Sequence, residues 1–560
     1  MKKFNYLIIL FISLVLGWQL LRPGYYSMHD DLQVMRLFEM NRCFENGQIP
    51  CRWVPDLGQN YGQPLFNYYS ALPYYLGQIF HFAGFTYIDT VKLLFLMSLF
   101  LSGVFVYRLT REFMKESAAL VAAIAYLTAP YHAVDIFVRG ALSESWGLTL
   151  VPLVLYSLIR VCRQPRATNS VIFALSLAAL LTTHNITVLI SFPILVIFGA
   201  YFFLTSPKKK SQTFYLIPGV MFGIGLSAFF LFPVLFEQSY IQTKFLTSDY
   251  FDFRAHFVTI GQLFTKLTWG YGPSRFNSFQ YPQTLSFFVG ILPVVSILIS
   301  PVLLWIRRRD RQLFPLIIII FTLSLLTLFM THSRSLPIWE SVKPLNFVQF
   351  PWRFLGPVSL LTSILIGFAI DVIKVVGRRL TQITFFFIAF LIAANFSNFQ
   401  FEKYFPNETD QQKLSGEAYD SQIRGALLDY LPSSVKVIPI SKAPANPQVL
   451  SGIVETNYFD KRSNYFSSEF DIRSDTAEIR FPIMDFPGWT VYQNRSGIPV
   501  KFDVNNDYGQ ITVKLTKGHQ LIQAFFENTP LRGVSNAITF ISGFLLTLWL
   551  VLDQRRPDEK

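Results

Sequence analysis

The sequence contains few charged residues for its length. Asp, Glu, Lys and Arg make up only 15% of its 560 residues, whereas 52% are hydrophobic and 17% are aromatic. Soluble globular domains carry about 25% charged residues, so this composition excludes an ordinary soluble globule. We interpret the chain as a polytopic membrane protein.

Cysteine is also scarce, and the three that occur are Cys43, Cys51 and Cys162. No Cys or His spacing matches a structural zinc site. Cys43 and Cys51 fall in one expected outer loop, where they either form a disulfide or remain two free thiols. Cys162 is expected on the cytoplasmic side.

Apolar stretches of about 17–25 residues, long enough to cross a bilayer as helices, recur about twelve times. They lie near residues 4–22, 90–108, 117–131, 145–160, 170–183, 186–205, 214–235, 284–306, 313–331, 354–376, 381–397 and 535–552. No Ala-x-Ala cleavage pattern follows the first stretch, so we expect it to be a retained signal anchor.

The basic residues predict the orientation of these spans. If Lys2 and Lys3 are cytoplasmic, alternation brings every tight basic cluster to the same side. The clusters lie within residues 108–115, 160–166, 208–210, 307–311, 374–379 and 555–560. Essentially all of the formal charge of +13 is then cytoplasmic. The basic balance thus reflects membrane topology, with both termini cytoplasmic and no nucleic-acid partner implied.

This topology divides the chain into three parts. Residues 1–397 form a transmembrane module with outer loops at 23–89, 236–283 and 332–353. Residues 398–534 form an extracytoplasmic domain, and residues 535–560 form the last span and a cytoplasmic tail. The fold class is therefore mainly α, a membrane helix bundle with an extracytoplasmic β domain inserted before the last span.

The β domain is predicted from alternating apolar and polar residues between Glu469 and Glu527, broken by turn signals such as Pro487-Gly488 and Lys517-Gly518. We expect a β-sandwich from about residue 450, preceded by a helix near residues 410–431. Such a domain is equally consistent with carbohydrate binding and with a passive spacer.

An acidic pair, Asp30-Asp31, opens the first outer loop just beyond the first span. Carboxylates at a membrane face are costly to keep dehydrated, and they are typical of a general base, a metal ligand or both. The alternative is structural, since either Asp could cap a helix over residues 32–44.

Further polar residues are expected on the same outer face. A single His or Arg at such a position usually satisfies a neighbouring helix or reaches the interface. Together, carboxylates, histidines and arginines can deprotonate a hydroxyl and hold a phosphate leaving group. The candidates are His29, Arg139, Glu144, His184, His256 and Arg353.

Several short motifs carry a family resemblance. Residues 29–31, 50–58, 138–141 with Glu144, and 349–353 resemble bacterial membrane proteins catalogued as 6-pyruvoyl-tetrahydropterin synthase-related. Residues 486–489 and 528–532 are similar to the outer domain of YfhO-like proteins. The order of first span, acidic outer loop, many further spans and terminal outer domain resembles the C-type (GT-C) membrane glycosyltransferases. The pterin label looks like a misnomer, because the chain lacks the zinc-binding histidine cluster of the soluble synthase.

The GT-C resemblance implies transfer of a sugar from a polyprenyl-phosphate donor to a glycan, lipid or protein acceptor on the outer side. By that analogy Asp30 or Asp31 is the base that activates the acceptor, while Arg139 or Arg353 neutralises the lipid phosphate. We take Asp31 as the base candidate and Asp30 as its partner, since the second acid is nearer the start of the expected helix. Some relatives use a divalent metal, for which Asp30 and Asp31, with His29, would be the ligands, and many work without one. No Trp-Trp-Asp signature is present, which disfavours N-glycosylation of peptides.

Two further absences bear on the donor and on the rival functions. No Asp-x-Asp or Gly-rich phosphate loop occurs on the inner side, which favours a lipid-linked donor over a nucleotide sugar. No internal repeat is visible and the polar residues gather on one face, which disfavours a lipid or polysaccharide transporter or flippase. A non-catalytic glycan-binding protein of the cell envelope remains open.

Overall fold

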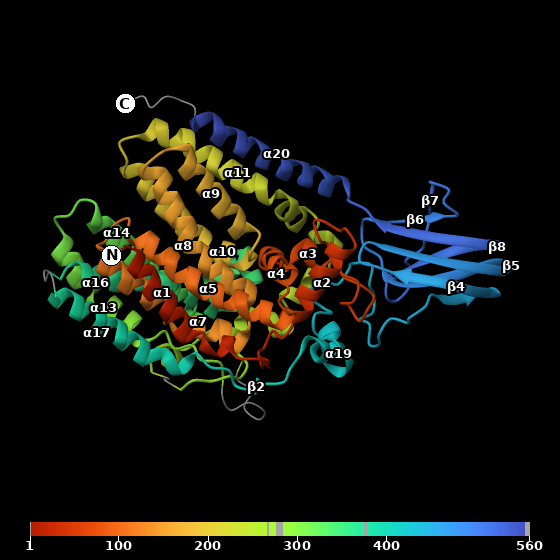
Figure 1. Ribbon diagram of the computed structural model, residues 1–560, viewed down its shortest axis with the longest axis horizontal. Coiled ribbons are helices and arrows are strands. Elements are labelled where there is room, and N and C mark those ends of the chain that lie inside the picture. The colour runs from red at the N-terminus through yellow and green to blue at the C-terminus, as the bar shows by residue number, and fades with distance from the viewer. Residues whose placement is uncertain (1, 266–267, 276–283, 374–377, 555–560) are drawn as a thin grey trace.

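The computed structural model describes residues 2–265, 268–275, 284–373 and 378–554. Positions 374–377 and 555–560 of the basic clusters lie outside the described residues, as do parts of the loop 236–283. Helices form an elongated bundle with an antiparallel sheet at one end (Figure 1). The start of α1 and the end of α20 lie toward the opposite end of the bundle (Figure 1).

Among the described residues, seven helices are long and apolar enough to cross a membrane. They are α5 (Tyr87–Thr110), α8 (Leu142–Arg163), α10 (Asn185–Thr205), α11 (Lys209–Phe236), α14 (Leu313–Met330), η9 with α16 (Pro351–Phe354 and Leu355–Asp371) and α20 (Pro530–Gln554). An eighth span is broken, because α6 (Glu116–Leu127) meets α7 (Pro130–Ala133) and η2 (Val134–Arg139) at a bend of 41°.

Four shorter apolar helices complete the set within the described part of the chain. They are α1 (Lys2–Leu16), α9 (Ala167–Leu181), α13 (Ile291–Arg307) and α17 (Arg378–Asn395). Each predicted span overlaps one of these helices, so the multi-pass class is confirmed. Among the described residues, however, only seven or eight helices are long enough to cross a membrane, rather than the predicted number of about twelve. The other four predicted stretches form shorter helices.

Helix α6 lies in the centre of the bundle, in contact with α5, α16 and α17. Its buried residues include four small ones, Ala118, Ala119, Ala122 and Ala123, which are all fully buried. Small side chains let helix backbones approach closely in a membrane. This close packing fixes the position of the broken span that begins with α6.

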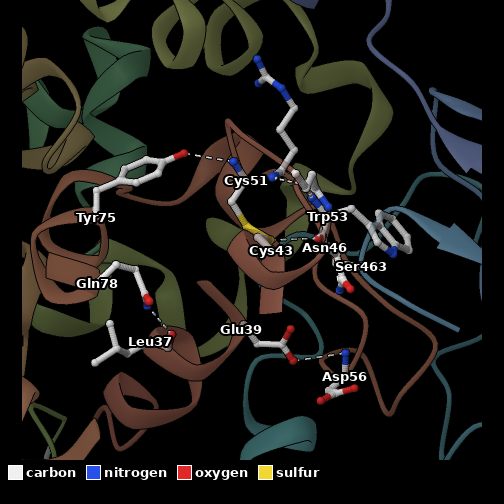
Figure 2. Close-up of a disulfide and its surroundings, with 12 residues drawn as sticks. Leu37, Glu39, Cys43, Asn46, Cys51, Trp53, Asp56, Tyr75, Gln78 and Ser463 are labelled. Atoms are coloured by element: carbon white, nitrogen blue, oxygen red, sulfur yellow. Dashed lines mark hydrogen bonds between the residues drawn. A yellow bond between two sulfur atoms is a disulfide. The ribbon is translucent and has the colours of Figure 1, made fainter. Parts of the chain in front are cut away.

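The first outer loop contains β1 (Tyr25–Tyr26), α2 (Gln33–Glu45), α3 (Leu65–Tyr68) and α4 (Leu72–Phe82). Strand β1 pairs with β2 (Tyr404–Phe405), which joins this loop to the segment that precedes the sheet. Cys43 and Cys51 form a disulfide at the end of α2, where the backbone N–H of Cys51 donates to the Tyr75 hydroxyl at 3.0 Å (Figure 2).

Replacing both Cys43 and Cys51 by Ser should lower the free energy of unfolding by about 2 kcal/mol, because the bridge closes a short loop and restricts the unfolded chain. The midpoint of thermal unfolding in detergent, with and without reductant, measures this effect. Cys162→Ser is the matched control, since Cys162 is a free buried thiol. A wild-type midpoint that reductant does not change would contradict a stabilising bridge.

Short helices lie in the described segments between the longer helices and before the sheet. They are η1 (Trp18–Leu21), η3 (Gln238–Tyr240), η4 (Thr243–Leu246), η5 (Asp249–Phe251), η6 (Phe253–His256), α12 (Ile260–Phe264), η7 (Ser333–Ser335), α15 (Leu336–Ser341), η8 (Lys343–Val348) and η10 (Phe396–Asn398). The helix expected at 410–431 is instead two helices, α18 (Asp410–Lys413) and α19 (Gly416–Gly425). The break occurs because Ser415, at the N-cap position of α19, has an extended backbone, with φ −141° and ψ 165°.

The sheet contains β3 (Gln448–Ser451), β4 (Val454–Lys461), β5 (Tyr465–Met484), β6 (Trp489–Gln493), β7 (Pro499–Val500) and β8 (Gln510–Phe526). The predicted antiparallel β domain is confirmed, but its six strands join in one sheet of order β3-β5-β8-β6-β7, with β4 also paired to β5. Register shifts along β5 and β8 bend these long strands.

The apolar face of this sheet is covered by loops rather than by a second sheet. Trp53, Tyr61 and Tyr68 of the first outer loop and Leu431 of the preceding segment share one buried cluster with the sheet residues. The Trp53 and Trp489 rings pack edge to face with centroids 5.8 Å apart. The sheet is therefore docked on the first outer loop, which also carries the acidic pair.

Candidate functional site

A cavity of about 1310 Å³ lies where the outer loops, the broken span and the α18–α19 segment meet. Its walls come from parts of the chain that are far apart in sequence. They include residues 29–32 and 68–70 of the first outer loop, residues 139–144, residues 184–186, residues 349–353 and residues of the segment 413–430. Seven of the eight sequence-predicted candidates line this cavity, and only His256 does not.

The acidic pair is held against the broken span by backbone hydrogen bonds. The N–H of His29 donates to the carbonyl of Val138 at 3.0 Å, and the N–H of Asp30 donates to the carbonyl of Arg139 at 2.9 Å. Helix α2 begins after Leu32, which makes no side-chain cap hydrogen bond. The alternative interpretation of the acidic pair as a helix cap is therefore wrong.

Asp30 is fixed by its neighbours on α2. Its Oδ2 accepts from Arg36 Nη1 at 2.8 Å and from Gln33 Nε2 at 3.0 Å. The Arg36 guanidinium lies against the ring of Tyr69, 4.2 Å from its centroid, and donates to its hydroxyl at 3.0 Å. This arrangement neutralises and orients the Asp30 carboxylate.

Asp31 has a different environment. Its Oδ2 pairs with Lys413 Nζ, contributed by a residue 382 positions further along the chain. Its Oδ1 is buried and has no hydrogen-bond partner among the described residues. Burial raises the pKa of the Asp31 carboxyl, and Lys413 opposes this shift. Asp31 therefore has both a free acceptor atom and a raised affinity for a proton.

A π-helical turn places Arg139 opposite the first turn of α8. Helix η2 ends at Gly140, whose φ of 63° is left-handed. A Cβ at this glycine would lie 2.1 Å from Met28 Sδ, so only glycine fits the close approach to the loop before the acidic pair. The π-helical turn and this glycine together set the direction of Arg139.

Glu144 binds both candidate arginines. Its Oε2 accepts from Arg139 Nη1 at 2.9 Å and from Arg353 Nε at 3.1 Å, and its Oε1 accepts from the Tyr131 hydroxyl at 2.5 Å. Arg139 also pairs with Asp135 at 2.5 Å. Two guanidinium groups from separate spans are thus brought together by one buried carboxylate.

Each arginine retains N–H groups for a ligand. Arg353 Nη1 donates to the carbonyl of Val348 at 2.8 Å and to Gln349 Oε1 at 3.1 Å. The Nη2 atoms of Arg139 and Arg353 have no hydrogen-bond partner in the part of the chain that the structure describes. Because both arginines line the cavity, these groups can bind an anion such as a phosphate there.

The three candidate histidines have different positions. His29 lines the cavity, and its Nε2 lies 2.8 Å from the carbonyl oxygen of Tyr271. Burial lowers the pKa of His29, so it is uncharged at neutral pH. His184 also lines the cavity and caps α10. His256 lies behind the wall, with its ring 4.7 Å from that of Phe350, so the structure does not bring it to the cavity.

The acidic pair does not fit a divalent metal in this arrangement. Arg36 and Lys413 contact the carboxylates of Asp30 and Asp31, which places cations where a metal would bind. No group of three His, Cys, Asp or Glu side chains within the described ranges could hold a metal ion.

Three residues of the site were not predicted from the sequence, namely Arg36, Lys413 and Asp429. Arg36 follows Asp30 by six positions on the expected helix, a weak signal that could have found it. No local pattern marks Lys413 or Asp429, since both reach the cavity through the tertiary fold.

Comparisons with known proteins agree with a membrane fold. A family model described as 6-pyruvoyl-tetrahydropterin synthase related domain, membrane protein, matches residues 66–402. A protein of Lactococcus lactis subsp. cremoris (strain MG1363), named only as uncharacterized, is 22% identical over 246 residues, which cover 42% of this chain and 40% of that protein.

Solved structures of similar fold include an arabinofuranosyltransferase, ArnT and an oligosaccharyltransferase. Arabinofuranosyltransferase AftD from Mycobacteria has a TM-score of 0.44 at 13% identity over 72% of this chain and 28% of AftD. ArnT from Cupriavidus metallidurans bound to undecaprenyl phosphate has a TM-score of 0.38 at 14% identity, over 69% of this chain and 62% of ArnT. The Archaeoglobus fulgidus oligosaccharyltransferase has a TM-score of 0.40 at 13% identity, over 71% of this chain and 56% of that enzyme. The chain spans less than two thirds of each relative, and these scores are all below 0.5, so activity must be inferred from the site itself.

Proposed function

The chain belongs to the 6-pyruvoyl-tetrahydropterin synthase-related family of membrane proteins, and we propose that it is a GT-C-type glycosyltransferase. It transfers a sugar from a polyprenyl-phosphate donor to an acceptor on the outer face of the membrane. One observation carries the proposal. A carboxylate with a free oxygen and a pair of guanidinium groups line the same cavity, as proton abstraction and phosphate departure require.

The reaction is a single displacement at the anomeric carbon of the sugar. The Asp31 carboxylate takes the proton of the acceptor hydroxyl as the acceptor oxygen forms its bond to the anomeric carbon. The bond from that carbon to the phosphate oxygen breaks, and the polyprenyl phosphate leaves with the electron pair. Attack opposite to the leaving group inverts the anomeric centre.

Arg139 and Arg353 stabilise the negative charge that develops on the departing phosphate. Guanidinium groups stay charged and can bind two oxygens at once, which suits a phosphate. Glu144 keeps both arginines in place before the donor binds, so little reorganisation is needed during the reaction. Arg36 and Lys413 supply positive charge to the acidic pair, and for this reason we propose that the reaction needs no metal.

The apolar lining of the cavity supports a lipid-linked donor. Ile186 lies in the first turn of α10, and Val234 and Leu235 lie in the last turn of α11. All three line the cavity together with Leu246 and Phe347. Apolar residues at the outer ends of two spans can accept the first units of a polyprenyl chain. The phosphate would then lie between this apolar surface and the two arginines.

The orientation in the membrane is part of the proposal. The sheet lies at one end of the bundle, while the start of α1 and the end of α20 lie toward the other (Figure 1). The basic clusters favour a cytoplasmic position for the end that carries the start of α1 and the end of α20. The cavity and the sheet would then face the extracytoplasmic side of the cell membrane.

Purified protein in nanodiscs should hydrolyse one member of a panel of radiolabelled polyprenyl-phosphate sugars, with water in the place of the acceptor hydroxyl beside Asp31, and release the free sugar and the polyprenyl phosphate. Asp31→Asn should reduce this turnover about 100-fold, because it removes the general base. Asp30→Asn should have a smaller effect, since Asp30 acts through the orientation of the loop. Addition of EDTA should leave the wild-type rate unchanged.

Asp460→Asn is the matched control, because this carboxylate pairs with Arg462 on the sheet, away from the cavity. Turnover by Asp31→Asn equal to that of the control would exclude Asp31 as the base. A wild-type protein that turns over no donor in the panel would reject the transferase and favour a transporter.

A further inference from the structure

The two arginines of the cavity each lie against an aromatic ring. Arg139 Cζ is 4.6 Å from the centroid of the Trp352 ring, and Arg353 Cζ is 4.8 Å from the centroid of the Phe350 ring. The two rings stack on each other, with centroids 5.0 Å apart and planes 16° apart. All four residues line the cavity, and we call them the arginine–ring cluster.

Glu144 and the rings hold the arginines in different ways. Glu144 accepts from both guanidinium groups and offsets part of their positive charge. An aromatic ring attracts a cation through its π electrons without removing that charge. A further carboxylate in the place of each ring would neutralise the arginines and occupy N–H groups that a phosphate needs. The rings therefore hold the guanidinium groups and leave their remaining N–H groups to a ligand.

Neighbouring side chains fix both rings. Phe350 is 7% exposed and Trp352 is 2% exposed. The His256 ring meets the Phe350 ring edge to face, with centroids 4.7 Å apart, and the Phe251 ring lies 6.0 Å from that of Phe350. The Phe287 ring lies 6.0 Å from the Trp352 ring. Close packing leaves the two rings little room to turn, so they can set the positions of the arginines.

The backbone at Gln349 is strained where the chain enters the cluster. Its φ of 65° is uncommon for a residue with a Cβ and persists only where neighbouring contacts hold it. Gln349 Nε2 donates to the carbonyl of Leu246 at 2.9 Å, and Oε1 accepts from Arg353 Nη1 at 3.1 Å. Strain of this kind is typical of ligand sites, and here it precedes three of the four members of the arginine–ring cluster.

We infer that Trp352 and Phe350 are positioning residues for the phosphate of the donor. Trp352 acts through Arg139, and Phe350 acts through Arg353. The inference rests on the proposed function and adds the side chains that direct the two guanidinium groups toward the lipid phosphate. Neither ring takes part in making or breaking a bond. When a ring is removed, its arginine is free to turn away from the cavity, and the affinity for the phosphate falls.

Binding of a lipid phosphate that carries no sugar tests this role without turnover. Protein in nanodiscs is titrated with farnesyl phosphate by calorimetry, with empty nanodiscs as the background and farnesol as the ligand without a phosphate. Trp352→Leu should weaken the binding of farnesyl phosphate about tenfold and leave that of farnesol unchanged. Phe350→Leu should weaken it about fivefold, because Phe binds a cation less strongly than Trp. Trp352→Phe keeps a ring and should recover most of the affinity.

A double-mutant cycle separates positioning from a general structural role. If Trp352 acts through Arg139, Trp352→Leu should weaken binding in the wild-type background and have no further effect in an Arg139→Gln background. Equal weakening in both backgrounds would show that the ring acts independently of the arginine, and it overturns the inference. A Trp352→Phe protein that binds as weakly as Trp352→Leu also overturns it.

Trp339→Leu is the matched control for the loss of a buried ring. Trp339 is fully buried, stacks on Phe253 with centroids 5.1 Å apart and does not line the cavity. This variant should lower the midpoint of thermal unfolding without changing the affinity for farnesyl phosphate.

The fate of the proposed function can be told apart from that of the inference. A wild-type protein that binds no farnesyl phosphate overturns the positioning role, whereas donor hydrolysis that depends on Asp31 would still leave the transferase intact. Binding that is coupled between Trp352 and Arg139, in a protein that turns over no donor, would keep the positioning role for a lipid phosphate and reject the transferase.

Discussion

Glu144→Gln should reduce the rate of sugar transfer about 10³-fold, a larger reduction than the one expected for Asp31→Asn. A single preorganised donor to a developing anion contributes about 10²–10³ to the rate, and Glu144 orients two such groups, Arg139 and Arg353. Gln has the shape of Glu but no charge, so the two guanidinium groups would repel each other with only Asp135 to compensate. The initial rate of sugar release in nanodiscs at saturating donor measures the effect.

A general loss of stability must be separated from this electrostatic effect. Ser145→Ala is the matched control on the same helix, because Ser145 contacts Ser98 in the bundle rather than the cavity. The midpoint of thermal unfolding of both variants reports their folding. A Glu144→Gln protein that folds and retains more than a fifth of the wild-type rate would show that the arginines need no shared carboxylate.

The elements of this fold that depend on local patterns were predictable from the sequence. Apolar stretches of span length and alternating strands leave a direct signal, and both classes of element are present. The single sheet was not predictable in the same way. Its apolar face is covered by Trp53, Tyr61 and Tyr68, which lie about 400 positions before the strands that they cover. Alternation indicates that one face is buried but does not indicate what buries it.

The site shows the same limit at the level of single residues. Asp31 could be proposed from its position beside a span, yet its partner Lys413 lies 382 positions away and has no distinctive local pattern. His256 was selected for its residue type in an outer loop, and it lies behind Phe350 instead. Residue type and loop position locate the face of the membrane on which a site forms, whereas tertiary contacts decide which side chains reach it.

Arg532→Leu should destabilise the protein by about 3–5 kcal/mol, because it leaves Glu237 as a buried charge without its cation. Arg532 is fully buried, and its Nε donates to Glu237 Oε2 at 2.9 Å. Its Nη1 donates to the carbonyl of Pro487 at 2.8 Å. One side chain at the start of α20 thus joins the end of α11 to the sheet. Thermal unfolding and limited proteolysis between β8 and α20 measure the loss.

The reason for the large effect is that the pair has no access to water. Glu237 is also 2% exposed and accepts from Asn67 at 2.9 Å and from Thr529 at 2.7 Å, so its charge cannot be solvated when Arg532 is removed. Arg532→Leu combined with Glu237→Leu removes both charges and should recover much of the lost stability. Arg462→Ala is the control, because that pair lies on the exposed surface of the sheet. If Arg532→Leu unfolds at the same temperature as this control, the junction between the bundle and the sheet must be held by the aromatic cluster around Trp53 alone.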